Sequence, residues 1–199
     1  MTRVARREEP LDPAHLGSTF LTATSWHVLT GAACCGKTTL VDMLATRGFA
    51  VLPESARWYF DRALAAGRTL EELRADDHAL QRSIAALQIR WEQGLDARTT
   101  TFLDRALPDS VTFYRLVGLD PNEILPACFR HRYASVFILD RLPAHRDRML
   151  GPEDEESSAF LDEWLERDYR ALGYHVVRVP PLAPAARMDF VLDRIPPVS

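Results

Sequence analysis

The chain of 199 residues has few cysteines, no long apolar run and no excess of basic residues. Its three cysteines are too few for a disulfide framework or a zinc site, and they suit a reducing cytoplasm. No apolar run reaches the roughly 18 residues of a membrane-spanning helix, so we expect no membrane partner. The net charge of −4 supplies no general basic field, which disfavours a nucleic-acid partner. No apolar segment follows the basic residues at the start, so we expect no secretory signal and a cytoplasmic protein.

Lysine is scarcer than any other charged residue. Among the 24 Lys and Arg residues, the only lysine is Lys37. The chain uses arginine where a general cation suffices and keeps one compact ammonium group, which suits phosphate binding. Lys37 belongs to the stretch GAACCGKT, in which Gly31 and Gly36 are separated by four residues and are followed by Lys and Thr. This spacing fits the phosphate-binding loop motif.

The flanking sequence supports this interpretation. An apolar stretch over 26–30 predicts a strand before the loop, and helical periodicity after it predicts a helix that ends near Gly48. Glycines let successive N–H groups turn inward at a helix N-terminus, where they bind anions. The alternative is an accidental glycine-rich turn, which would not require a strand before it and a helix after it. We therefore expect a nucleotide triphosphate to contact Gly31, Ala32, Ala33, Cys34, Cys35, Gly36, Lys37, Thr38 and Thr39.

Within this loop, Lys37 is expected to reach the β- and γ-phosphates, and the Thr38 hydroxyl to ligate Mg²⁺. The adjacent Cys34 and Cys35 have two interpretations. They are either small side chains at variable loop positions, or they make the loop sensitive to oxidation, because helix N-termini lower the pKa of thiols.

Acidic residues follow two further predicted strands. Glu54 follows the apolar run 49–52, and Asp104 with Arg105 follows the run 99–103. Ligands bind at the carboxyl ends of strands in open α/β sheets, so Glu54 is a candidate general base and Asp104 a candidate ligand of Mg²⁺. Arg105 is a candidate for holding the acceptor or a phosphate. The alternatives are a carboxylate favoured by a helix N-terminus for Glu54 and an ordinary ion pair for Asp104 and Arg105. Asp109 either faces an acceptor or caps a helix.

The irregular segment 141–156 contains several arginines after the fourth predicted strand, 134–139. Such a segment suits a lid that closes over the phosphates and stabilises charge on the transferred group. Arg146 and Arg148 are the catalytic candidates, and Arg141 is a third. The alternative is an exposed polar loop.

Strands and helices alternate along the chain, with a fifth strand predicted over 174–179. This pattern predicts an α/β fold with a mainly parallel, doubly wound sheet of five strands, flanked by helices. Residues 1–24 show little periodicity and are interpreted as a tail or loosely packed lead-in. Residues 25–199 are expected to form a single domain.

Five segments occur in a recognisable order: GAACCGKTTL, VLPESAR, FLDRALPD, ILDRLP and DYRALGYHVVRVPP. Together they resemble a bacterial group of P-loop proteins often named AAA-type ATPases. The domain of that group is similar to nicotinamide riboside kinase and to the nucleoside and thymidylate kinase-like P-loop kinases. The resemblance implies a three-layer P-loop kinase fold, strand order 2-3-1-4-5, and ATP with Mg²⁺ as cofactors. It also places Glu54 at the position of the base in nucleoside kinases and Asp104–Arg105 at their acid–arginine pair.

The chain departs from these relatives in three respects. No separate C-terminal helical domain of a ring ATPase is visible, the lid lacks the dense arginine spacing of nucleotide monophosphate kinases, and Cys34 and Cys35 replace the usual small residues. We therefore expect an ATP- and Mg²⁺-dependent kinase that phosphorylates a hydroxyl, or less readily a phosphate, of a small-molecule acceptor. The alternatives are a regulatory ATPase switch without an acceptor and an antibiotic-type phosphotransferase. A homodimer is one possible oligomeric state.

Overall fold

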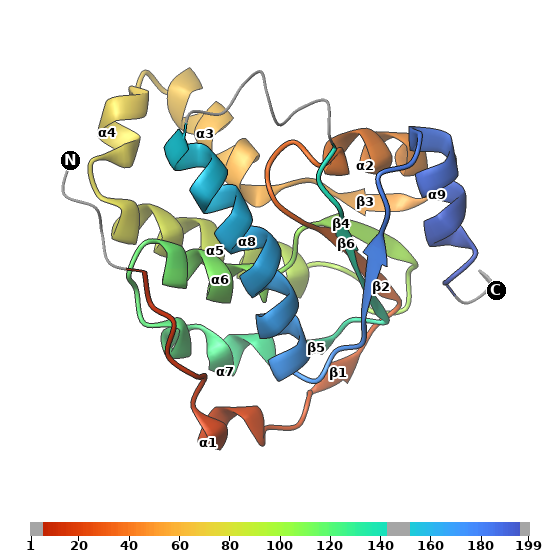
Figure 1. The fold of residues 1–199 in the computed structure, drawn as a ribbon, viewed down its shortest axis with the longest axis horizontal. Helices are drawn as coiled ribbons and strands as arrows, with labels where there is room; N and C mark the ends of the chain where they lie inside the picture. Colours follow the sequence, from red (N-terminus) through yellow and green to blue (C-terminus); the bar gives the residue numbers. More distant parts are fainter. Residues whose placement is uncertain (1–5, 143–151, 196–199) are drawn as a thin grey trace.

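The computed structural model describes residues 6–142 and 152–195. Its centre is a sheet of five parallel strands with helices on both faces (Figure 1). The spatial order β3–β4–β2–β6–β7 is the second, third, first, fourth and fifth of the predicted strands, so the predicted order 2-3-1-4-5 is confirmed. The strands are β2 (Trp26–Thr30), β3 (Ala50–Leu52), β4 (Thr101–Asp104), β6 (Ser135–Leu139) and β7 (Val176–Val179).

The central strand β2 divides its side chains between two cores. Trp26 and Val28 belong to one apolar cluster, whereas Leu29 belongs to the other, because successive strand residues point to opposite faces. All residues of β2 are buried, as expected for a parallel strand covered on both faces. The first cluster includes residues of α5 (Asp77–Gln93), α6 (Asp109–Leu116) and α8 (Pro152–Ala171), and the second includes residues of α2 (Lys37–Thr46) and α9 (Pro184–Leu192).

Two short helices and their caps connect β3 to α5. Helix α3 (Ser55–Ala65) follows Glu54 directly, and α4 (Leu70–Arg74) begins at Thr69. The Thr69 hydroxyl accepts from the Glu72 N–H and the Glu72 carboxylate accepts from the Thr69 N–H. These two bonds form the capping box that the spacing of Thr69 and Glu72 in the sequence predicts. Asp76 then caps α5 by accepting from Ala79 N–H.

The helical pattern of the sequence also predicts a single helix over 121–131, and this prediction is wrong. The segment forms a 3₁₀ turn η1 (Pro121–Glu123), a short helix α7 (Leu125–Cys128) and a strand β5 (His131–Arg132). Pro126 lies inside the segment, and a proline cannot donate the backbone hydrogen bond that a continuing helix needs.

Residues 6–24 lie against the rest of the chain. After the short helix α1 (Pro13–Leu16), strand β1 (Thr22–Ala23) pairs in parallel with β5. Leu11 is buried in the first cluster, and Arg7 N–H donates to Arg115 O at 3.0 Å. The described part of the lead-in therefore contributes to the core.

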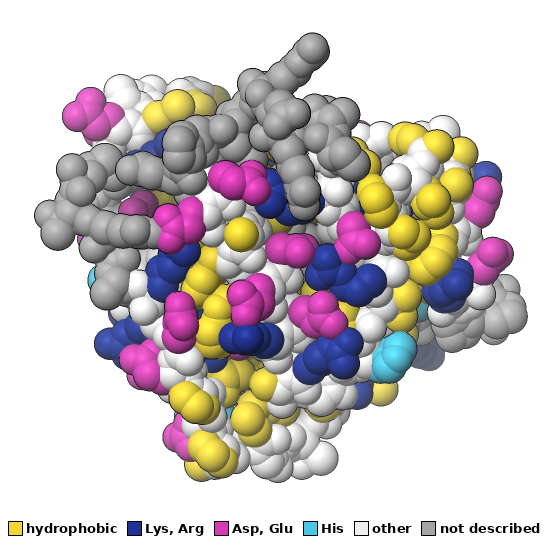
Figure 2. Space-filling view, in the orientation of Figure 1, with side chains coloured by type: hydrophobic (Ala, Val, Ile, Leu, Met, Phe, Trp, Pro, Cys, Tyr) yellow, Lys and Arg dark blue, Asp and Glu magenta, His cyan; other side chains and the backbone are white. Residues whose placement is uncertain are grey.

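No described helix is long and apolar enough to cross a membrane. Acidic and basic side chains lie side by side over α8 (Figure 2). They include the ion pairs Glu163–Arg167 and Glu166–Arg170, at 2.5 and 2.6 Å, each one helical turn apart. This face therefore presents charges of both signs.

Candidate active site

The loop between β2 and α2 depends on its glycines. Gly31 has φ +140°, and a Cβ there would lie 2.7 Å from Leu139 O, which no side chain tolerates. Gly36 caps α2 in the left-handed conformation with φ +88°. Cys34 adopts φ +57°, which is uncommon for a residue with a side chain. Three of the six residues from Gly31 to Gly36 thus have positive φ angles.

Lys37 lies across this loop. Its ammonium Nζ donates to Gly31 O at 3.1 Å and Ala32 O at 2.9 Å, and it lies 3.5 Å from Cys35 Sγ. The residue is 7% exposed. A phosphate bound at the loop would replace these carbonyl oxygens as the partner of Lys37, which is the only lysine in the chain.

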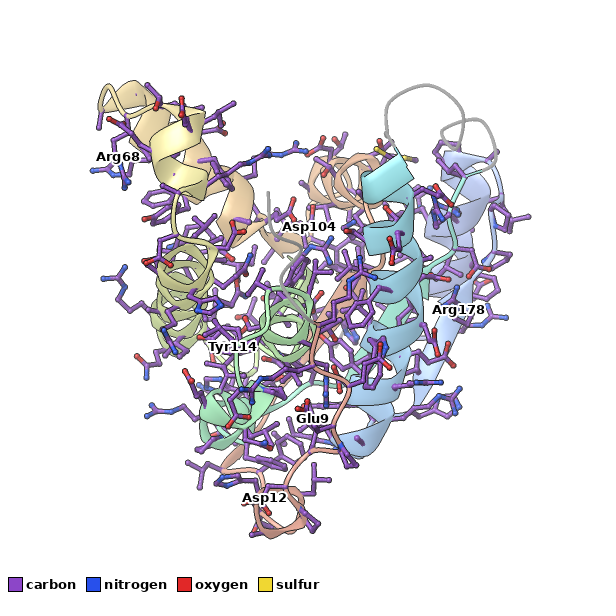
Figure 3. All side chains as sticks on the ribbon, turned by 60° about the vertical axis from the view of Figure 1, so that its left-hand side comes forward. Glu9, Asp12, Arg68, Asp104, Tyr114 and Arg178 are labelled. Carbon is purple, nitrogen blue, oxygen red and sulfur yellow. The ribbon has the colours of Figure 1, made fainter. Side chains whose placement is uncertain are left out.

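Asp104 ends β4 inside the molecule, near α2 (Figure 3). Thr38 Oγ1 donates to Asp104 Oδ2 at 3.2 Å, while Asp104 Oδ1 is buried and has no hydrogen-bond partner among the described residues. Burial raises the pKa of Asp104, and the negative charge of Glu54 adds to this, against the opposing charge of Lys37. A buried oxygen without a partner beside a threonine hydroxyl fits a Mg²⁺ site. The described residues contain no cluster of three His, Cys, Asp or Glu that could hold a metal, so phosphate oxygens and waters would have to complete the set of ligands.

Glu54 and Arg105 form an ion pair at the ends of β3 and β4. Arg105 Nε donates to Glu54 Oε1 at 2.8 Å, and both side chains are mostly buried. Burial alone would raise the pKa of Glu54, but the charges of Arg105 and Lys37 outweigh it and lower the pKa below its ordinary value. The carboxylate therefore stays ionised and able to accept a proton.

Two cavities meet at Glu54. The larger has a volume of about 340 Å³, and the smaller, of about 170 Å³, is lined by Thr38, Glu54 and Asp104 among others. The larger cavity is lined by residues of the loop, α3, α5, α6 and α8: Ala33, Glu54, Ser55, Ala56, Phe60, Arg74, Asp77, Leu80, Gln81, Ile84, Gln88, Arg105, Ala106, Asp109, Ser110, Phe113 and Leu161.

The family model for an AAA domain (AAA_28) matches residues 26–187, which is more than half of the chain. The chain belongs to this family. No curated protein sequence matches it.

Solved structures of similar fold are kinases and NadR. Thymidylate kinase from Ehrlichia chaffeensis has a TM-score of 0.61 at 12% identity, over 86% of this chain and 98% of that one. The NadR protein in complex with NR has a TM-score of 0.62 at 24% identity, over 88% of this chain and 54% of that one. This AAA domain thus spans about half of the NadR chain. Deoxyadenosine kinase from M. mycoides has a TM-score of 0.58 at 14% identity, over 85% of this chain and 97% of that one. The fold is that of P-loop nucleoside and nucleotide kinases.

A buried network behind Arg105 in this AAA domain was not predicted in full. Arg105 has φ +68°, and its NH1 donates to Asp109 Oδ1 at 3.1 Å and to Thr30 Oγ1 at 3.3 Å. Thr30 also donates to Asp109 Oδ1, and Asp109 Oδ2 accepts from Ala106 N–H at 3.1 Å and from Tyr169 OH at 2.6 Å. Asp109 therefore orients Arg105 and leaves its Nε for Glu54. The sequence left Asp109 with two interpretations, an acceptor contact or a helix cap, and did not indicate a role for Tyr169.

Arg187 of α9 is a second residue that the sequence did not identify. It is 3% exposed, and its guanidinium donates to Pro180 O at 2.8 Å, to Asp140 O at 2.7 Å and to Cys35 O in the loop. It thus ties the phosphate-binding loop to the ends of β6 and β7. Since 152 residues separate Arg187 from Cys35, no local pattern could have revealed this contact.

The expected lid falls mostly outside the described residues, including Arg146 and Arg148. Arg141 lies at its start and forms an ion pair with Glu155 of α8, with NH1 2.7 Å from Oε1. In the loop, Cys34 is exposed and Cys35 is buried.

Proposed function

We propose that this AAA domain is an ATP- and Mg²⁺-dependent kinase that transfers the γ-phosphoryl group to a hydroxyl of a small molecule. The observation that carries the proposal is the position of Glu54, which lines both cavities. One of them also contains Thr38 and Asp104, and the other is large enough for an acceptor. A base between a phosphate site and an acceptor site is what hydroxyl phosphorylation requires.

The residues would divide the chemistry as follows. Lys37 and the loop N–H groups hold the β- and γ-phosphates, and Thr38 with Asp104 would hold Mg²⁺. When bound, Mg²⁺ neutralises charge on the phosphate oxygens. Glu54 accepts the proton of the acceptor hydroxyl while the new O–P bond forms and the bond to the leaving ADP breaks. Arg105, which donates to Glu54, would offset the charge that develops on the transferred group. Arg146 and Arg148 remain candidates for a lid.

The structural neighbours support a small acceptor. They are thymidylate kinase, deoxyadenosine kinase with bound products, and NadR with NR or with NAD and AMP-PNP. These proteins act on or bind nucleosides and nucleotides, and a nucleoside-like acceptor is therefore our first candidate here. An antibiotic-type phosphotransferase would use the same site with a different acceptor.

The AAA domain match favours one alternative of another class, a regulatory ATPase. Its output would be a conformational change read by a partner, with slow hydrolysis and no acceptor. Transfer and hydrolysis give different products, so a single experiment separates the two functions.

That experiment follows the label from γ-labelled ATP in the presence of Mg²⁺ over a panel of nucleosides, sugars and aminoglycosides. The kinase predicts a labelled organic phosphate that depends on one acceptor class and is lost in Lys37→Ala. Release of inorganic phosphate at a rate that no acceptor changes would instead establish the ATPase.

A further inference from the structure

Arg187 is a buried arginine that forms no ion pair with any described residue. The buried Arg105 and Arg115, by contrast, form ion pairs with Glu54 and Asp168. Burial lowers the pKa of Arg187 below its ordinary value, whereas in Arg105 the effect of burial is outweighed by Glu54 and other carboxylates, which raise the pKa. A buried cation without an anionic partner costs stability unless an anion binds nearby.

The Arg187 guanidinium joins three segments of the main chain. Cys35 O belongs to the loop after β2, Asp140 O follows β6 and Pro180 O follows β7. The Asp140 carboxylate accepts instead from Arg178 Nε at 2.7 Å. Because a guanidinium presents its donors in fixed directions within one plane, it holds the loop and the two strand ends in one relative position.

The bond to Cys35 O also sets the direction of the next N–H group. No described peptide bond is cis, and in a trans peptide the C=O and the following N–H point in opposite directions. Arg187 holds Cys35 O from the buried side of the loop, so the Gly36 N–H points to the other side. A Cβ on Gly36 would lie 3.4 Å from Arg187 NH1, so the guanidinium lies against this glycine. Gly36 is half-buried, and no described residue accepts from its N–H.

We propose that Arg187 is a positioning residue that directs the Gly36 N–H toward the bound phosphates and places a positive charge one peptide behind them. The inference rests on the proposed nucleotide site, but not on transfer to an acceptor. A cation that binds a carbonyl polarises its peptide, which strengthens the N–H on the other side as a donor. The phosphates in turn supply the negative charge that Arg187 lacks within the described part of the fold.

Binding of two ligands to the wild type and to Arg187→Gln tests this assignment. The ligands are ADP and inorganic tripolyphosphate, each with Mg²⁺, and affinity is measured by calorimetry. Tripolyphosphate has no base, so it separates the loop from the segment after β7 that Arg187 also contacts. We expect Arg187→Gln to bind both ligands about tenfold more weakly. Tripolyphosphate that binds both proteins equally, or neither of them, would overturn the assignment.

The amide proton of Gly36 reports on the geometry itself. In ¹H–¹⁵N spectra of the wild type, we expect its resonance to move downfield when ADP and Mg²⁺ bind, because a hydrogen bond to an anion deshields the proton. At saturating ADP the movement should be much smaller in Arg187→Gln, and a general loss of stability would not produce this difference. A Gly36 resonance that moves equally in both proteins contradicts the inference.

Two further variants separate this role from general effects of charge and folding. Arg47→Gln removes an exposed cation whose ion pair with Asp189, at 3.7 Å, also joins α2 to α9. It should keep the affinity for tripolyphosphate within about twofold, and a loss equal to that in Arg187→Gln would overturn the assignment. Arg187→Lys keeps the charge but cannot reach three carbonyls in one plane, so we expect a smaller loss. If Arg187→Gln does not fold, wild-type affinity for both ligands in Arg187→Lys overturns the assignment.

These outcomes are separate from the fate of the proposed kinase. Weaker phosphate binding by Arg187→Gln, without phosphoryl transfer by the wild type, would remove the kinase and leave Arg187 in its role. Transfer by the wild type, with equal phosphate affinity in Arg187→Gln, would keep the kinase and remove Arg187 from phosphate binding.

Discussion

Arg105 donates from Nε to Glu54 Oε1 at 2.8 Å, while its NH1 donates to Asp109 on the other side. The guanidinium therefore joins the candidate base to a buried carboxylate that cannot move freely. The pair with Arg105 helps to lower the pKa of Glu54, and it holds the carboxylate at the wall of the cavity.

The pH dependence of transfer should report on that pair. Arg105 and Lys37 lower the pKa of Glu54 against the effect of burial, so the base stays ionised at pH values where an ordinary carboxylate begins to protonate. In the pH profile of kcat/KM, we expect the acid limb of the wild type to lie at low pH and that of Arg105→Gln to lie at higher pH. Arg74→Gln, which removes an exposed arginine of the same cavity, is the control and should leave the limb in place. An unmoved limb in Arg105→Gln would remove this electrostatic role.

Replacement of the only lysine should strongly lower the rate of phosphoryl transfer, even when the positive charge is kept. Lys37→Ala and Lys37→Arg are both expected to lower the transfer rate by at least about 100-fold, because a planar guanidinium cannot fill the position of a compact ammonium within the loop. Initial rates with saturating ATP measure the effect, and thermal unfolding checks that both variants fold. Near-normal transfer by Lys37→Arg would show that a general cation suffices.

Tyr169 should act on the site through Asp109. Tyr169→Phe removes the hydroxyl that donates to Asp109 Oδ2 at 2.6 Å, and we expect a loss of about 1 kcal/mol in stability. We also expect a several-fold fall in kcat with unchanged affinity for ATP, because Arg105 loses part of its support.

Tyr174→Phe provides the matched control. Its hydroxyl is held by His131 O at 3.2 Å, and its ring lies 5.7 Å from that of Tyr169. We expect a comparable change in stability and no change in kcat. Equal kinetic effects in the two variants would mean that Tyr169 is purely structural.

His27 should make stability depend on pH. Burial lowers the pKa of His27 from 6.5 to about 4, so the folded state holds the neutral ring while the unfolded chain is protonated below about pH 6.5. The stabilisation is present above pH 6.5 and is lost as the pH falls towards 4. Integration over pH 7 to 5 gives a loss of about 2 kcal/mol.

Denaturant titration of the wild type and of His27→Gln at both pH values measures this loss. The difference between the proteins isolates His27 from the carboxylates, which titrate in both. Identical pH dependence in the two proteins would contradict the assignment.

Local patterns in the sequence predicted the scaffold of the fold. Continuous apolar runs predicted the five strands, and the glycine spacing predicted the loop. The expectation that parallel strands end at one edge of the sheet placed Glu54, Asp104 and Arg105 near each other. Parallel β1 and β5 were missed because each has only two residues, too few for a periodic signal.

Long-range contacts explain what was not predicted. The hydrogen bonds of Arg187 to Cys35 and of Tyr169 to Asp109 join residues 152 and 60 positions apart, and neither residue carries a local mark of its role.

The most direct test of the account is the fate of the labelled γ-phosphoryl group in the wild type and in Glu54→Gln. We expect the wild type to place the label on the hydroxyl of an acceptor, and Glu54→Gln to lower that rate by about 100-fold or more with ATP affinity retained. Label that appears only as inorganic phosphate in the wild type, or transfer that proceeds equally well in Glu54→Gln, would contradict it.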